Sequence, residues 1–168
     1  MARSVDVAAE SPASVEQILS AFGDEGYWHA RLAEFDGGTA TLESLDVDDD
    51  GAVRARIRVG LLPEGLPTVV RQLAPGDLHM LRDETWSPSG DGSVSGVIAV
   101  EVPGAPVSAS GQARLSPTSS GSVMSYTATV KVKVPLVGGR IESWMCGRTT
   151  DEIAKVHAFT NTWIAQGD

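Results

Sequence analysis

Residues 135–165 read PLVGGRIESWMCGRTTDEIAKVHAFTNTWIA, and their apolar residues recur with the period of an α-helix. At 100° per residue, five large apolar side chains fall on one face of such a helix: Ile141, Met145, Val156, Phe159 and Trp163. We therefore predict a helix over residues 137–165 that turns this face toward a sheet. Ser143, Lys155 and Gln166 should lie on its solvent side.

The chain before this helix has the period of β-strands. Between residues 39 and 134, apolar and polar residues alternate, and Gly, Ser and Pro turns interrupt them at short intervals. This spacing favours an antiparallel meander over parallel βαβ units. The expected strands are 39–47, 53–59, 77–86, 93–102, 108–115 and 123–134, with a first strand at 4–8. The connection over 61–76 is expected to hold one helical turn around Val69 and Val70.

Two short helices are predicted between the first strand and this meander. Ser11 and Pro12 should supply the N-cap and the first position of one helix, and Gly23 should end it. Asp24 should cap the second, which is expected to stop at the glycine pair that begins with Gly37. The apolar stripe of the first is Val15, Ile18, Leu19 and Phe22, and that of the second is Tyr27, Trp28, Leu32 and Phe35.

Together these elements predict an α+β fold, with a curved antiparallel sheet of about seven strands and the long C-terminal helix across its concave face. Residues 1–168 are expected to form one domain. Several strand positions expected to face the helix carry small side chains: Ala55, Gly96, Ala109, Gly111, Ala113 and Ala128. Because these side chains do not reach a helix that two short ones hold off the sheet, we predict an apolar cavity between helix and sheet.

Composition narrows the classes of function. The 168 residues are 42% hydrophobic and 21% charged, as in ordinary globular proteins, and they carry a net charge of −9. Such a chain repels phosphate backbones and anionic lipids, so neither nucleic acid nor a membrane surface is an expected partner. No apolar run reaches the ~18–20 residues that cross a bilayer, and the single Cys146 fits a reducing compartment. We expect a cytoplasmic protein that is a monomer or a weak dimer.

The motifs for metals and nucleophiles are incomplete. Residues 46–51 read DVDDDG and begin like a calcium loop, but Ile57 stands where a bidentate acid is required. We therefore interpret them as an acidic hairpin turn. The three histidines lack the spacing of metal ligands, and a base that would activate Cys146 cannot be located from the sequence. Neither a metal nor a cofactor is expected, and catalytic residues stay unassigned.

Three segments carry a resemblance to a known superfamily. They are GYWHARL at 26–32, PGDL at 75–78 with ETW at 84–86, and VKVKVPLVGGRIE at 130–142. With the element order, they resemble the START/polyketide-cyclase-like (SRPBCC) superfamily, whose fold is the helix-grip, and within it an actinobacterial family with no assigned function. The resemblance covers nearly the whole chain and implies an apolar ligand between the sheet and the long helix. A minority of the superfamily are cyclases or dehydratases, but no catalytic motif carries over.

Two polar pairs interrupt apolar faces. Arg82 and Glu84 share a face of the strand at 77–86 with Trp86, and Arg148 and Glu152 lie one turn apart in the helical stripe. Ionised groups are costly inside a protein unless they are paired. The pairs therefore either bond to each other at the rim or in solvent, or anchor the head group of a mostly apolar ligand. Both interpretations remain open at this stage.

We expect intracellular binding of a small hydrophobic molecule, such as a lipid, an acyl chain or a polyketide-like metabolite. The predicted ligand contacts are Arg82, Glu84, Trp86, Tyr126, Ile141, Trp144, Met145, Arg148, Glu152 and Phe159. One alternative is a cyclase or dehydratase that uses Glu84 and Arg82 in the cavity. Another is an antitoxin-like interaction partner, which predicts a filled core and an exposed apolar patch.

Overall fold

The computed structural model describes residues 2–62, 64, 66–73 and 78–167, and within them one antiparallel sheet of seven strands. The strands are β1 (Ala2–Ser11), β2 (Gly38–Val47), β3 (Val53–Leu61), β4 (Leu78–Pro88), β5 (Val94–Glu101), β6 (Val107–Thr118) and β7 (Gly121–Val132). Their order is β1-β7-β6-β5-β4-β3-β2, so the predicted meander is confirmed and β1 pairs with its last strand. Asp77, the predicted start of one strand, lies outside the described residues.

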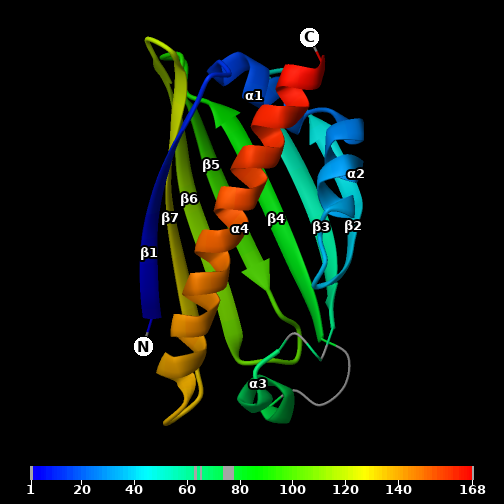
Figure 1. The fold of residues 1–168 in the computed structure, drawn as a ribbon, viewed down its shortest axis with the longest axis vertical. Coiled ribbons are helices and arrows are strands. Elements are labelled where there is room, and N and C mark those ends of the chain that lie inside the picture. The colour runs from blue at the N-terminus through cyan, green and yellow to red at the C-terminus, as the bar shows by residue number, and fades with distance from the viewer. Residues whose placement is uncertain (1, 63, 65, 74–77, 168) are drawn as a thin grey trace.

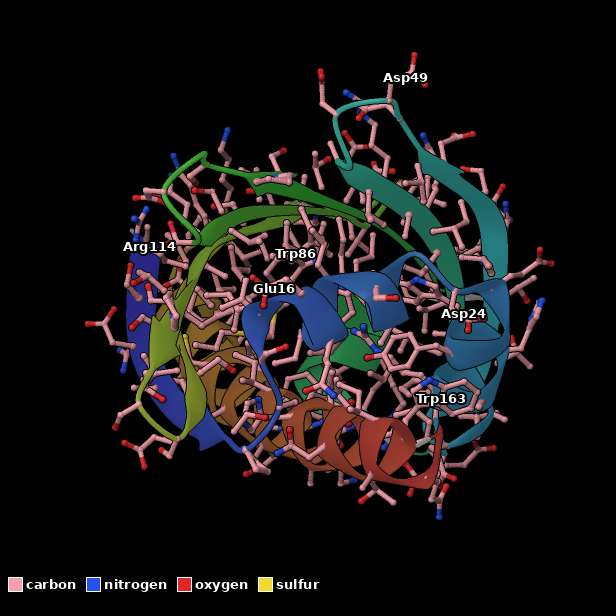
Figure 2. The ribbon with its side chains drawn as sticks, turned by 90° about the horizontal axis from the view of Figure 1, so that it is seen from above. Glu16, Asp24, Asp49, Trp86, Arg114 and Trp163 are labelled. Atoms are coloured by element: carbon pink, nitrogen blue, oxygen red, sulfur yellow. The ribbon has the colours of Figure 1, made fainter. Side chains whose placement is uncertain are left out.

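The helices of the described ranges lie on the concave side of this sheet. They are α1 (Val15–Phe22), α2 (Glu25–Ala33), α3 (Thr68–Leu73) and α4 (Gly138–Gly167). Figure 1 shows α4 crossing the sheet diagonally, from the end where β1 begins to the end where α1 lies. Viewed from above, the sheet curves around α4 and the two short N-terminal helices (Figure 2). The α+β helix-grip arrangement is therefore confirmed, including the helical turn predicted around Val69 and Val70.

Two details of the short helices were predicted wrongly. The N-cap of α1 is Ser14, whose hydroxyl accepts from the backbone N–H of Gln17 while the Gln17 side chain accepts from that of Ser14. Ser11 instead ends β1, where its hydroxyl accepts from the Ala13 N–H. The second helix ends at Ala33, before the predicted Phe35. Gly23 and Asp24 do cap the two helices as predicted.

The register predicted for the long helix is confirmed. Ile141 is buried, and the other four members of the stripe are partly buried against the interior. Ser143, Lys155 and Gln166 are exposed, and Ser143 lies on the side of the helix opposite Ile141. The structure therefore presents the predicted apolar face of α4 to the sheet.

Polar contacts fix α4 at both ends. Near its start, the buried Glu142 carboxylate accepts from the backbone N–H of Val132 at 2.9 Å, which ties the helix to the end of β7. Near its end, the Tyr27 and Thr160 hydroxyls are 2.6 Å apart. Because the Thr160 hydroxyl donates to a backbone carbonyl of α4, Tyr27 is the donor in this pair. Trp163 packs against α2 beside it (Figure 2).

The acidic segment at 46–51 forms the turn of the β2–β3 hairpin. The Asp48 carboxylate accepts from the backbone N–H groups of Asp50 and Ala52, which is a local turn contact. Gly51 has φ +85, a conformation that other residues rarely adopt. Figure 2 shows Asp49 at the tip of the hairpin, pointing away from the molecule. These contacts support the hairpin interpretation.

Only some of the small strand residues that were predicted to open the cavity border it. A Cβ at Gly96 would collide with the Trp86 ring, and one at Gly111 would lie 2.8 Å from Cζ of Tyr126. These two glycines therefore make room for aromatic side chains of neighbouring strands and do not themselves open a cavity. Ala109 and Ala128 do border the cavity described below.

Candidate functional site

A cavity of about 380 Å³ lies between the concave face of the sheet and α4. This volume falls within the ~300–1,000 Å³ of typical small-molecule pockets. Its wall is mainly aliphatic and aromatic, and it includes Ile57, Val59, Ile98, Val100, Val130 and Ile153. The predicted cavity is therefore present, and the filled core that the interaction alternative predicts is not.

All ten residues predicted as ligand contacts border this cavity: Arg82, Glu84, Trp86, Tyr126, Ile141, Trp144, Met145, Arg148, Glu152 and Phe159. They come from two strands of the sheet and from α4, so the fold brings together residues that are far apart in the sequence. Their contact with a ligand remains a prediction.

The polar centre of the cavity wall is Glu84, whose carboxylate is almost completely buried. Its Oε2 atom is 2.7 Å from Nε of Arg82 and 3.1 Å from a terminal nitrogen of Arg31. Its Oε1 atom accepts from the indole N–H of Trp86 at 3.0 Å. Both carboxylate oxygens are thus engaged, and one carboxylate serves two guanidinium groups. We call Arg31, Arg82, Glu84 and Trp86 the Glu84 cluster.

Strand β4 positions most of this cluster. Arg82, Glu84 and Trp86 alternate along the strand and so point to the same face. The register sets Glu84 between Ala55 of β3 and Ile98 of β5, in the middle of the sheet. Its side chain is 1% exposed, whereas that of Arg82 is 29% exposed. Glu84 therefore lies at the floor of the cavity, and Arg82 reaches toward its interior.

The electrostatics of the cluster keep Glu84 ionised. Burial opposes the charged form, but the guanidinium groups of Arg82 and Arg31, with the Trp86 N–H, outweigh it and hold the pKa of Glu84 at about 2. Burial likewise opposes the charge of Arg82, and Glu84 outweighs it, so the pKa of Arg82 is raised. Burial raises the pKa of the nearby Tyr126 hydroxyl. Arg82 and Glu84 thus bond to each other, as one of the two interpretations held, but they do so inside the protein and not at the rim or in solvent.

The second predicted pair behaves differently. Arg148 is exposed and its guanidinium lies 6.0 Å from the Trp144 ring centre, a cation–π contact at the edge of the cavity. Glu152 is partly buried. Among the described residues, these two side chains make no ion pair with each other. Arg148 therefore lies at the rim, while Glu152 approaches Arg82 closely enough to favour its charged form.

Sequence reasoning missed Arg31, the second cation of the Glu84 cluster. Its side chain is 9% exposed, and its guanidinium stacks over the Trp28 ring at 4.4 Å. A signal was present, because Arg31 lies four residues after the buried Tyr27 and so interrupts the apolar face of α2. This is the same criterion that singled out Arg82.

The remaining chemistry-bearing residues do not form a site. No group of three or more His, Cys, Asp or Glu side chains that could hold a metal occurs in the described part of the chain. Cys146 is buried, and burial raises the pKa of its thiol, which makes it a weak nucleophile. No helix in the described ranges combines the length and apolar character needed to cross a membrane.

A curved antiparallel sheet that grips one long helix over a cavity defines the START-like, helix-grip class of protein, and solved structures share it. A START superfamily protein from Mycobacterium smegmatis has a TM-score of 0.56 and 14% identity, over 98% of this chain and 99% of that one. Norcoclaurine synthase from Thalictrum flavum, in complex with dopamine and hydroxybenzaldehyde, has a TM-score of 0.57 and 14% identity, over 100% and 89%. At such identities the likeness shows the fold alone.

The sequence matches one family over residues 6–164, and the chain belongs to it: Protein of unknown function (DUF2505). A relative from Mycobacterium tuberculosis, the uncharacterized protein Rv0481c, is 38% identical over 170 residues, which is 98% of each chain. The predictions of a START-like, helix-grip fold and of a family with no assigned function are therefore confirmed.

Proposed function

We propose that this protein binds a small hydrophobic molecule in the cavity between the sheet and α4. The observation that carries the proposal is the cavity of about 380 Å³ with its mainly apolar wall. Removing apolar ligand surface from water contributes roughly 25 cal/mol per Å², so a ligand that fills this space gains affinity without specific polar contacts. The proposal includes a cytoplasmic location, in keeping with the acidic composition and the single cysteine.

The cyclase or dehydratase alternative receives less support. An efficient general base has a pKa near the working pH, so that it is both free to accept a proton and basic enough to take it. Glu84 has a pKa of about 2, and both of its oxygens are already hydrogen-bonded. Glu84 is therefore a weak base near neutral pH, and we assign it the role of holding the two guanidinium groups in position.

Binding is tested with an environment-sensitive apolar dye and with decanol as competitor. The protein should bind the dye saturably, decanol should displace it, and binding should alter tryptophan fluorescence. Native mass spectrometry of protein purified without denaturation should show a bound molecule that unfolding releases. Absence of saturable binding of both dye and decanol would refute the proposed function.

A matched pair of variants locates the binding. Ala109 of β6 borders the cavity, whereas Gln112 of the same strand is exposed on the opposite face. Ala109→Leu should lower the affinity for decanol roughly tenfold, because the larger side chain occupies space that the ligand would fill. Each CH₂ contact that the ligand loses is worth about 0.8 kcal/mol. Gln112→Leu should leave decanol affinity unchanged. Equal effects of the two variants would refute binding in this cavity.

A further inference from the structure

The Glu84 cluster carries a surplus positive charge inside the protein. Arg31 and Arg82 share the single carboxylate of Glu84, and the side chains of Arg31 and Glu84 are 9% and 1% exposed. An uncompensated charge in such a place is costly, so a mobile anion or solvent must balance it. This surplus occurs in a chain whose net charge is −9, so it is a local feature and not a consequence of composition.

Arg82 is the member of the cluster that can reach a ligand. Arg31 is covered by Trp28 and is bonded to Glu84. Arg82 donates to Glu84 through Nε, its guanidinium group also lies close to the Tyr126 hydroxyl, and within the described residues it forms no ion pair with a second carboxylate. Its side chain is 29% exposed and borders the cavity. The flat outer edge of its guanidinium group is therefore available to a cavity ligand.

The groups that face Arg82 do not cancel this surplus. Glu152 approaches Arg82 from α4 and favours its charged form. Glu152 and Glu34 are the other acids in the cavity lining, and Arg148 and Lys155, which also border the cavity, balance them in number, so the lining as a whole keeps one surplus positive charge. Tyr126 lies next to Arg82, and burial raises the pKa of its hydroxyl, so it is a neutral hydrogen-bond donor near pH 7. A neutral donor beside a guanidinium group favours an anion over a cation.

We propose that the ligand is a carboxylic acid with an apolar body, and that its carboxylate binds the free edge of the Arg82 guanidinium. This inference rests on the proposed function and specifies its ligand class. A single surplus charge matches a monoanion, and a guanidinium edge binds a carboxylate through two parallel hydrogen bonds. At ~30 Å³ per water-sized group, the cavity holds about a dozen non-hydrogen atoms, which is the size of decanoate.

The test compares head groups on one ten-carbon chain. The wild-type protein should bind decanoate roughly tenfold to a hundredfold more tightly than methyl decanoate, because a hydrogen bond to a charged group is worth more than one to a neutral ester. Decylammonium should bind more weakly than the ester. The overall negative charge of the protein works against decanoate, so a preference for the acid reports the local field of the Glu84 cluster. Dye displacement at neutral pH and low salt measures all three affinities.

Two arginine variants assign the preference to a residue. Arg82→Met should remove the preference for decanoate and leave the affinity for methyl decanoate within about threefold, since Met keeps an apolar body of similar length. Arg82→Lys should keep part of the preference, because it retains the charge but loses the guanidinium fork. Arg58→Met is the matched control, because Arg58 is exposed on the opposite face of β3, and it should keep the full preference.

The outcomes separate the two proposals. If decanol and the dye bind but wild type does not prefer decanoate to its ester, the carboxylate inference is wrong while the cavity function stands. Tighter binding of decyl phosphate than of decanoate would also overturn it. If no ten-carbon ligand binds, the proposed function itself fails. The wild-type comparison decides these points even if Arg82→Met does not fold.

Discussion

The replacement Glu84→Gln tests whether the Glu84 cluster is an internal ion-pair network. Gln has nearly the shape of Glu and keeps an acceptor oxygen, but it removes the charge that neutralises Arg31 and Arg82. Two guanidinium groups would then lie in the interior without a carboxylate between them. Removal of one partner from a buried ion pair costs about 3–5 kcal/mol in known cases.

The lowered pKa of Glu84 gives a second value for the free energy that its ion pairs contribute. A shift from 4.5 to about 2 corresponds to about 3 kcal/mol at ~1.4 kcal/mol per pH unit. Because the folded-state pKa is the lower one, this contribution is complete above the unfolded-state pKa of 4.5. It declines as the pH falls below that value and is lost once the pH passes the folded-state pKa of about 2.

Urea unfolding of wild type and Glu84→Gln between about pH 7 and pH 3 measures this effect. The variant should be less stable by about 3 kcal/mol at neutral pH, and the difference between the two proteins should narrow below about pH 4.5. Asp83→Asn is the control, since Asp83 is half exposed and 3.8 Å from Arg56 on the convex face. Asp83→Asn should lower the free energy of unfolding by no more than about 1 kcal/mol, as is usual for surface ion pairs. A difference for Glu84→Gln that is the same at pH 7 and pH 3 would refute the reasoning.

Three further outcomes are expected. Gly111→Ala should lower the free energy of unfolding by about 1–3 kcal/mol, because the added methyl group collides with the Tyr126 ring. Gly147→Ala should raise it by up to ~1 kcal/mol, because open space surrounds this position of α4. Urea titrations that rank the two variants in the opposite order would contradict the packing. Phe159→Ala should strongly lower the affinity for decanol and should lower the free energy of unfolding by less than the ~3–5 kcal/mol that a fully packed phenylalanine contributes. A loss of stability in that full range with unchanged affinity would show that Phe159 is a core residue. The turn at 46–51 should bind no calcium, so the thermal midpoint should be the same in chelator and in millimolar calcium; a rise of several degrees would show a site.

Sequence patterns predicted the parts of this structure that follow from periodicity. The apolar stripe of α4 determined which of its faces packs on the sheet, since a helix with Ile141 inside must have Ser143, two residues later, outside. Alternation along β4 likewise predicted that Arg82 and Glu84 share the face of Trp86. In both cases the backbone geometry of one element was sufficient.

Contacts that depend on how one strand pairs with another could not be predicted from the sequence. Trp86 lies opposite Gly96 only because of the β4–β5 register, and no local pattern specifies that register. The start of α1 was ambiguous for another reason. Ser11 and Ser14 are both good N-caps, and Gln17 three residues after Ser14 completes a capping box that decides between them.

The pattern along β4 could not show whether Arg82 and Glu84 pair only with each other or belong to a larger cluster, because the additional residue, Arg31, comes from α2. Two ionised side chains on one strand form a neutral pair, which has little reason to attract a charged ligand. Arg31 of α2 changes this balance, because it adds a second cation to the same carboxylate. A buried ion pair of this kind is weak evidence for stability, since apolar side chains of similar volume often serve as well. The value of the cluster must therefore be sought in the cavity that Arg82 borders, and we propose that the charge of Arg82 lets this apolar space discriminate between ligand head groups.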